Sequence, residues 1–251
     1  MTVMQAPVDL LRYARLRRDY ARGVVTEPRV LRLRSLGGAA VLCRPSQDVF
    51  TFKHTFLARF HLPPAPLPPD ATIVDLGSNV GYTVADLAHH YPRARVIGVE
   101  MDAANFALAR ANTASFADRV TLIHAAVWTE NGVVSYSGAD GDDAFHVDGL
   151  ASTTAADSAP PAGVRNAPAR RLGSILDELC VSRVDYLKMD IEGAEGPLLA
   201  GSLDWADRVH SMKVEIHPPA TIESCRRALE ARGFTCWEDE HHPACLCAER
   251  R

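Results

Sequence analysis

The sequence predicts an α/β fold, in which helices cover both faces of a mainly parallel sheet. Three observations lead to this prediction. Short apolar strands alternate with helical patterns from residue 70 onward. The stretch "IVDLGSNVGYTVADL" reads as a buried strand, a turn with two glycines and a helix, and Glu100 ends the next strand.

The composition is that of an ordinary globular protein, with 47% hydrophobic and 23% charged residues among 251. A formal charge of −4 argues against nucleic-acid binding, which requires a basic surface. No apolar run is long enough to span a membrane, and no signal peptide is recognisable at the N-terminus. We therefore expect a cytoplasmic protein whose six cysteines are free.

Residues 1–69 are predicted to form an N-terminal cap region. The segment "PVDLLRYARLRRDYA" has helical spacing, and "RVLRLRSLGGAAVLCRP" indicates a hairpin turned by Gly37 and Gly38. A second helix, "SQDVFTFKHTFLARF", has Ser46 as N-cap, and "LPPAPLPPD" forms a stiff connector. The arginine-rich first helix is either a solvated face or a contact for an anionic substrate, a carrier protein or a second copy of the chain.

Residues 70–251 are predicted to form the main domain. Its strands are "ATIVDLG", "RARVIGVE", "RVTLIHAAV", "GVVSYSG", "RVDYLKM" and "RVHSMKVEIHPP", with a closing hairpin in "FTCWEDEHHPACLCAER". Its helices are residues 80–89, "DAANFALARANTASF", "RLGSILDEL", "GPLLAGSL" and "TIESCRRALEARGF". Residues 139–167 are small, acidic and rich in Gly and Pro, so we predict a loop insertion there that orders over a ligand.

The glycine turn contains Asp75, Gly77 and Gly81. A dinucleotide site would prefer three glycines in the pattern G-x-G-x-x-G, and a P-loop would require Gly-Lys-Ser/Thr. A carboxylate at this place repels a pyrophosphate and suits a ligand with an ammonium or sulfonium group. Glu100 is placed to accept the hydroxyls of a ribose, which NAD enzymes and methyltransferases share.

A third segment, "VDYLKMDIEGAE", supplies the Lys188, Asp190, Glu192, Gly193 and Glu195 pattern. Together with "VDLGSNVGYT", "VIGVEMDAANF", "CRPSQDVFTF", "HAAVWTENG" and "VEIHP", it resembles the FkbM-type S-adenosylmethionine-dependent methyltransferases over residues 44–217. The resemblance implies the class I methyltransferase (Rossmann-like) fold, with seven strands of which the last is antiparallel.

The resemblance also implies S-adenosylmethionine as cofactor and S-adenosylhomocysteine as product. Gly77 and Gly81 would let the backbone approach the methionine part, Asp75 would order the turn or meet the amino group, and Glu100 would hold the ribose. Ala126 stands where many class I enzymes carry an acidic residue for the adenine, so a backbone group would replace it. The implied cofactor residues are Asp75, Gly77, Ser78, Asn79, Gly81, Glu100, Met101, Ala126 and Asp190.

For methyl transfer to a hydroxyl, the sequence offers His217, Glu215 and Asp190 as catalytic candidates. His217 ends a strand and could accept a proton near neutral pH, or be a structural histidine. Glu215 lies on the same face and could orient His217, bind a metal or pair with Lys188. Asp190 would face the amino group or the substrate. Lys53 and His54 of the preceding helix could cap the cofactor pocket, but a solvated helix face is the favoured interpretation.

No metal site is predicted. Asp190, Glu192 and Glu215 could hold Mg²⁺, but the two glutamates also have simpler roles in a turn and an ion pair. The segment "HHPACLC" fits no common zinc spacing, and its two cysteines share one buried strand face.

The sequence therefore favours an O-methyltransferase acting on a small hydroxylated molecule, such as a natural product or a glycosyl compound. Two alternatives stay open. An NAD-dependent oxidoreductase would also use Glu100, but this sequence lacks the third glycine and the hydride-transfer motif that such an enzyme needs. A non-catalytic subunit that binds S-adenosylmethionine would have no use for Asp190 and His217.

Overall fold

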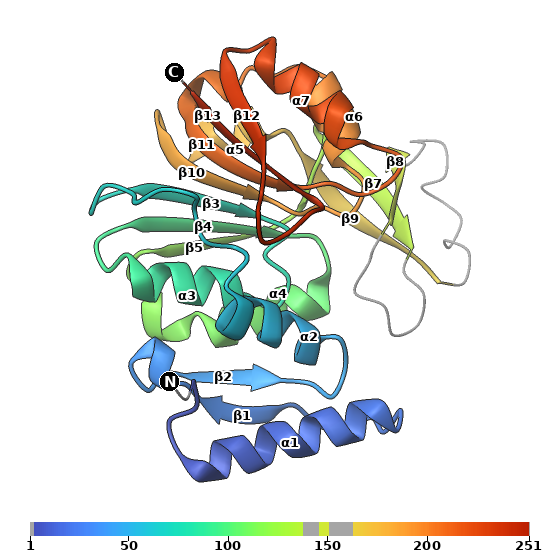
Figure 1. Ribbon diagram of the computed structural model, residues 1–251. Helices are drawn as coiled ribbons and strands as arrows, with labels where there is room; N and C mark the ends of the chain where they lie inside the picture. Colours follow the sequence, from blue (N-terminus) through green and yellow to red (C-terminus); the bar gives the residue numbers. More distant parts are fainter. Residues whose placement is uncertain (1–2, 138–145, 151–162, 251) are drawn as a thin grey trace.

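A seven-stranded sheet runs through the computed structural model, which describes residues 3–137, 146–150 and 163–250 (Figure 1). The strand order is β12-β13-β11-β10-β3-β4-β5. The strands are β3 (Thr72–Leu76), β4 (Arg95–Glu100), β5 (Val120–His124), β10 (Val184–Met189), β11 (Val209–Glu215), β12 (Phe234–Glu238) and β13 (Cys245–Arg250). Strand β13 is antiparallel to both of its neighbours, while β5, β4, β3, β10 and β11 pair in parallel. The predicted sheet, with its last strand antiparallel, is confirmed.

Helices cover both faces of this sheet. Helices α3 (Tyr82–His90) and α4 (Ala103–Asn112) lie on one face, and α5 (Leu172–Glu178), α6 (Glu195–Ala200) and α7 (Ile222–Glu230) lie on the other (Figure 1). Because side chains alternate along a strand, β3 supplies Ile73 to one apolar core and Val74 to the other. Within the described residues, no helix is long and apolar enough to cross a membrane, and all six cysteines are unpaired.

The N-terminal region forms a further layer beneath α3 and α4 (Figure 1). It contains α1 (Pro7–Ala21), the antiparallel pair β1 (Arg29–Arg32) and β2 (Ala40–Cys43), and α2 (Asp48–Lys53), which continues as a π-helical segment over residues 54–58. The predicted hairpin turn uses Gly37 at φ 65°. The Ser46 hydroxyl accepts the Asp48 N–H, although the helix itself begins at Asp48. Leu16 of α1 and Phe52 of α2 belong to the same core as helix α3.

A second sheet lies beside the main one, and the sequence did not predict it. It has the order β6-β9-β7-β8, with β6 (Ala126–Val127), β7 (Gly132–Ser137), β8 (His146–Leu150) and β9 (Val164–Arg170). The segment "GVVSYSG" is therefore antiparallel to β9 and does not join the main sheet. Strand β8 and the start of β9 also fall within residues 139–167, which were predicted as a loop. The remainder of that segment, including any lid, lies outside the described residues.

The strand order of the main sheet switches sides between β3 and β10. From β3 the sheet continues to β4 and β5 on one side and to β10 and β11 on the other. Loops that leave the carboxyl ends of such a strand pair diverge, and the crevice between them is the usual ligand site of open α/β sheets. Gly77 follows β3 and Asp190 follows β10, so both flank this crevice.

Candidate active site

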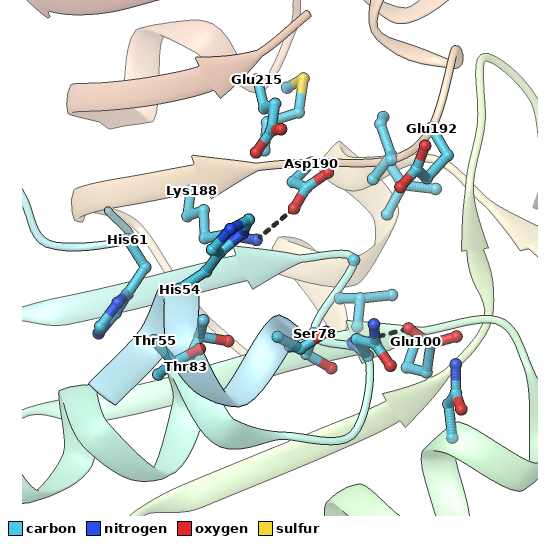
Figure 2. Close-up of a pocket in the computed structure, with 18 of the residues that line it drawn as sticks. His54, Thr55, His61, Ser78, Thr83, Glu100, Lys188, Asp190, Glu192 and Glu215 are labelled. Carbon is cyan, nitrogen blue, oxygen red and sulfur yellow. Dashed lines mark hydrogen bonds and ion pairs between the residues drawn. The ribbon is translucent and has the colours of Figure 1, made fainter. Parts of the chain in front are cut away.

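A cavity of about 340 Å³ opens at the carboxyl ends of β3, β4, β10 and β11 (Figure 2). Most of the residues predicted to bind the cofactor or to act in catalysis line it. These are Gly77, Ser78, Asn79, Glu100, Met101, Ala126, Asp190 and Glu215. Asp75, Gly81 and His217 do not line the cavity. They contact residues that do: Asp75 pairs with Lys188, the Gly81 N–H donates to the Ser78 carbonyl, and His217 pairs with Glu192. The structure therefore brings together residues that are up to 138 positions apart, from Gly77 to Glu215.

The turn after β3 is shaped by two glycines in the left-handed region. Gly77 has φ 75°, and a Cβ atom there would overlap the carbonyl oxygen of Asp190. Gly81 has φ 79°, and its Cβ would lie 2.8 Å from the Cα of Ala109 on helix α4. Gly77 thus lets two diverging loops approach each other, whereas Gly81 lets α3 start directly against α4.

Two polar side chains in this turn lack partners within the protein. Among the described residues, the buried Ser78 Oγ and Asn79 Oδ1 have no hydrogen-bond partner. Both residues line the cavity. Buried polar atoms are nearly always hydrogen-bonded, so these two indicate that a polar ligand completes the site.

Asp75 orders the turn from within the protein. Its carboxylate is fully buried, accepts the hydroxyl proton of Thr83 and pairs with Lys188 Nζ at 3.3 Å. Lys188 also pairs with Asp190 at 3.2 Å. Burial alone would lower the pKa of Lys188, but Asp75, Asp190 and Glu215 together raise it. Lys188 is therefore a charged link between the turns after β3 and β10.

Glu100 stands at the end of β4 and faces the cavity (Figure 2). Its two oxygens accept the N–H groups of Asn79 at 2.8 Å and Asp102 at 2.7 Å. Burial nevertheless raises the pKa of Glu100 to about 7. Each carboxylate oxygen keeps a free lone pair, so Glu100 can accept two further hydroxyl groups.

The cavity is apolar beyond Glu100. Val99, Met101 and residues 125–127 form this part of the wall. Ala126 presents no carboxylate, so polar contacts here come from the backbone or from Asn105, whose side chain also lines the cavity. A flat, mainly apolar ring fits this end of the cavity.

The opposite end, called here the acidic end, is lined by Asp190, Glu192 and Glu215 (Figure 2). Burial raises the pKa of Glu192 to about 7, and Asp190 adds to the shift. Burial also raises the pKa of Glu215, again with help from Asp190. The carboxylates thus crowd one another at the place where β10 and β11 end.

His217 lies next to the acidic end, with Nδ1 3.1 Å from Glu195 Oε1 and Nε2 3.5 Å from Glu192 Oε2. Burial alone would lower the pKa of His217, but the hydrogen bond to Glu195 and the charges of Glu192 and Asp190 raise it to about 9. His217 therefore carries a proton at neutral pH, and this state suits a counter-ion better than a base.

Helix α2 and its π-helical extension form one side of the cavity, which the sequence offered only as the less favoured alternative. The lining residues from this region are Gln47, Phe50, Thr51, His54 and Thr55. His54 is exposed, as expected of a solvated face, and it also points into the cavity near Lys188 and Asp190 (Figure 2). Burial lowers the pKa of His54, and His242 and Lys53 lower it further. The only sequence signal was the position of this helix directly before the first strand of the sheet.

Comparison with known proteins gives a consistent result. The family model described as the methyltransferase FkbM domain matches residues 75–236. The chain is 28% identical over 183 residues to the AMB antimetabolite synthetase AmbE of Pseudomonas aeruginosa. This match covers 60% of the chain but 8% of the synthetase, so the chain corresponds to a small part of that relative.

Among solved structures, the methyltransferase FkbM from Methylobacillus flagellatus has the same fold. The TM-score is 0.52 at 14% identity, and the match covers 96% of this chain and 60% of that one.

Proposed function

The chain belongs to the FkbM family of S-adenosylmethionine-dependent methyltransferases, and from this premise we propose that it methylates a hydroxyl group of a small molecule. A natural product or a glycosyl compound is the proposed acceptor. The name of the relative in Pseudomonas aeruginosa, an antimetabolite synthetase, supports the choice of a natural product.

We propose that the cofactor extends along the cavity from the glycine turn to the apolar end. Its methionine part would lie against Gly77, Ser78 and Asn79, its ribose at Glu100, and its adenine beside Met101 and Ala126. The observation that carries this proposal is the pair of buried, unpartnered atoms, Ser78 Oγ and Asn79 Oδ1, in the cavity that Glu100 also lines. A ligand with an ammonium group, a carboxylate and ribose hydroxyls would satisfy all three.

The acidic end would then receive the acceptor. S-adenosylmethionine supplies a methyl group on an excellent leaving group, so the protein has to align the acceptor oxygen, exclude water and remove one proton. Asp190 would orient the acceptor hydroxyl and take its proton; its position in the cavity lining and its ion pair with Lys188 support this role. Glu215 lines the same end, and protonated His217 would balance the charge of the carboxylates.

Two other functions predict different ligands. An NAD-dependent oxidoreductase would have to accommodate a pyrophosphate at this turn without the third glycine. A non-catalytic subunit would bind S-adenosylmethionine but transfer no methyl group.

The test is a calorimetric titration of the protein with S-adenosylmethionine, S-adenosylhomocysteine and NAD. We expect the first two to bind and NAD not to bind. Replacement Glu100→Gln should weaken both interactions, while Glu130→Gln, on the exposed surface, should leave them unchanged. Binding of NAD alone would contradict the proposal.

With the cofactor established, hydroxylated acceptors can be screened with S-adenosylmethionine that carries a labelled methyl group. Label on an oxygen of the product supports O-methylation. Label on nitrogen or carbon would assign the enzyme to another acceptor class.

A further inference from the structure

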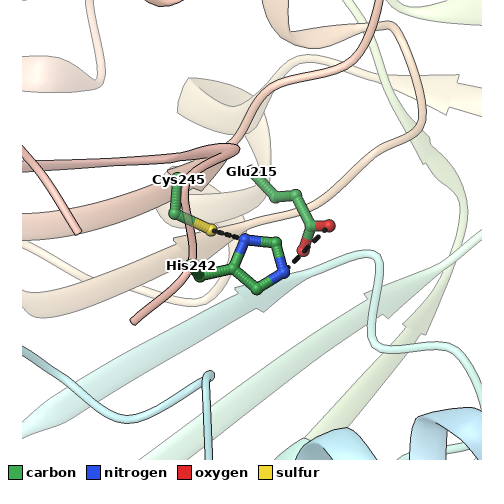
Figure 3. Close-up of side chains that lie close together, drawn as sticks. All are labelled: Glu215, His242 and Cys245. Carbon is green, nitrogen blue, oxygen red and sulfur yellow. Dashed lines mark hydrogen bonds and ion pairs between the residues drawn. The ribbon is translucent and has the colours of Figure 1, made fainter. Parts of the chain in front are cut away.

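Three side chains with different metal-binding atoms meet on the cavity wall at the acidic end. They are Glu215 at the end of β11, His242 in the loop before β13, and Cys245 at the start of β13 (Figure 3). The sequence had favoured no metal here, because the spacing of the segment "HHPACLC" fits no common zinc motif. That argument considered only neighbours in the sequence, and Glu215 comes from a different strand.

We propose that Glu215, His242 and Cys245 form a binding site for a divalent transition-metal ion, with Zn²⁺ as the preferred ion. One ligand atom from each residue lies within 4.8 Å of the other two. Cys245 Sγ is 3.2 Å from His242 Nδ1, and His242 Nε2 is 3.6 Å from Glu215 Oε1.

One of these distances is close to that of a zinc site. Zinc bonds of about 2.0–2.3 Å in a tetrahedron place neighbouring ligand atoms about 3.3–3.7 Å apart, and the 3.2 Å between Cys245 Sγ and His242 Nδ1 is near this range. Glu215 Oε1 contacts the other ring nitrogen, Nε2, and one ion binds one nitrogen of a histidine (Figure 3). The Glu215 carboxylate or the His242 ring therefore has to rotate before all three residues share an ion.

The protein backbone holds these residues in place. Glu215 and Cys245 are directly opposite partners in the antiparallel β11–β13 pair. The Cys245 N–H donates to the His242 carbonyl at 2.8 Å, and the His242 N–H donates to Asp239 Oδ1 at 3.1 Å. The ring of Phe60 packs edge-on against the His242 ring at 4.9 Å. The three ligands thus stand on a strand pair and a tight turn, so their backbone is fixed and only side-chain rotation is needed to complete the site.

The donor set determines which ion fits. A thiolate, an imidazole and a carboxylate suit Zn²⁺ and its transition-metal neighbours, whereas Mg²⁺ and Ca²⁺ prefer oxygen ligands alone. Three protein ligands leave one tetrahedral position, which would face the cavity. Sites with three protein ligands and one open position are typical of catalytic zinc.

The catalytic consequence rests on the proposed function, whereas metal binding does not. An acceptor hydroxyl at the open position would release its proton to Asp190 more readily. Its oxygen would then form a bond to the methyl carbon while the carbon–sulfur bond breaks, leaving the electron pair on sulfur. The site would thereby select acceptors that can bind a metal through the reacting oxygen.

The experiment uses the full chain without an affinity tag, stripped with a chelator and titrated with Co²⁺ and then Zn²⁺. We expect one ion per chain and a thiolate-to-cobalt charge-transfer band that Zn²⁺ abolishes. Cys245→Ser should remove this band. Cys245→Ser and His242→Gln should each weaken Zn²⁺ binding by at least about a hundredfold, because loss of even an outer-sphere partner costs about 10–100-fold.

Cys247→Ser is the matched control, because Cys247 is a buried thiol on the same strand outside the cavity lining. It should keep the band and the affinity. As a measurement that needs no variant, Zn²⁺ should protect Cys245 and not Cys180 from alkylation, as read by mass spectrometry.

The absence of a charge-transfer band in the wild-type chain would overturn the proposal. So would a metal that stays bound in Cys245→Ser and is lost in His217→Gln, because it would then occupy the Asp190, Glu192 and His217 group. Binding of S-adenosylmethionine without metal would leave the proposed cofactor site intact, so the two proposals can fail separately.

Discussion

Burial raises the pKa of the Glu100 carboxylate to near neutral pH. Its two backbone donors favour the ionised form, but loss of solvent outweighs them and gives a pKa of about 7. An ionised carboxylate is the stronger acceptor for ribose hydroxyls. The charge state of this one residue should therefore set the affinity of the cofactor near neutral pH.

We predict that S-adenosylmethionine binds more tightly as the pH rises from about 6 to about 8. The sign follows from the raised pKa, since Glu100 is mostly protonated below about 7 and ionised above it. Glu100→Gln should weaken binding about ten- to a hundredfold at the higher pH and remove the pH dependence. Calorimetry across this range measures both effects. An unchanged slope in the variant would mean that another group titrates.

At Gly77, both the positive φ and the lack of space disfavour a side chain. We predict that Gly77→Ala destabilises the fold by at least about 2 kcal/mol more than Gly23→Ala, because the added Cβ would overlap the Asp190 carbonyl. Gly23 has a similar φ of 65° but no atom within 4 Å of a built Cβ, so it isolates the cost of backbone strain. Urea unfolding of the two variants measures the difference. Equal losses of stability in the two variants would show that the turns after β3 and β10 can move apart to make room for the added Cβ.

At the scale of elements, strands β3 and β10 are joined by a buried charge pair as well as by their ladder. Lys188 and Asp75 are register partners, and their side chains pair at 3.3 Å. Removing one partner of such a pair leaves an uncompensated charge, which usually costs about 3–5 kcal/mol. The pair therefore acts as a specific link at the point where the ligand crevice forms.

We predict that Lys188→Met destabilises the protein by about 3–5 kcal/mol and that adding Asp75→Asn recovers a large part of this loss. The recovery follows because the double variant buries no unpaired charge. A double-mutant cycle by chemical denaturation gives the coupling energy. Strictly additive losses would indicate that solvent reaches Asp75 when Lys188 is removed.

The second sheet shows why some elements escape prediction from sequence. In β9 the buried positions are Ala167 and Ala169, which have low strand propensity and resemble a flexible segment. The strand forms because it pairs with β7 over six residues and covers Val134 and Tyr136. Long-range pairing, rather than local preference, defines this element.

At the scale of the whole molecule, the N-terminal layer and the sheet share one apolar core. Leu16 is fully buried in the cluster that includes Ile73 and Tyr82, although residues 1–69 were predicted as a separate cap. Tyr82 also donates its hydroxyl proton to the Leu42 carbonyl at 2.7 Å. We infer that the cap and the sheet unfold together.

We predict that Leu16→Ala lowers the free energy of unfolding by about 2–5 kcal/mol within a single transition. Leu11→Ala on the same helix is the control, because Leu11 is 61% exposed and should change stability by less than about 0.5 kcal/mol. Denaturation followed by far-UV circular dichroism and by cofactor binding measures both variants. Two separate transitions, with the second unchanged, would support an independent cap.

The sequence by itself determined the main sheet, the succession of its helices and strands, and the glycine turn and Glu100 that line the cavity. These features depend on local periodicity and on short spacings, such as the two glycines of the turn and Glu100 one strand later. The chain's membership in the FkbM family follows from the same motifs.

Only the tertiary structure decided the second sheet, the place of helix α2 beside the cavity and the make-up of the acidic end. His54, Glu215, His242 and Cys245 come from four separate segments, and their meeting depends on how the strands are ordered in the sheet. The charge state of His217 could not be predicted from the sequence either, because it depends on a hydrogen bond to Glu195 on a different element. Local patterns encode elements, whereas proximity and electrostatics arise from long-range packing that no single segment contains.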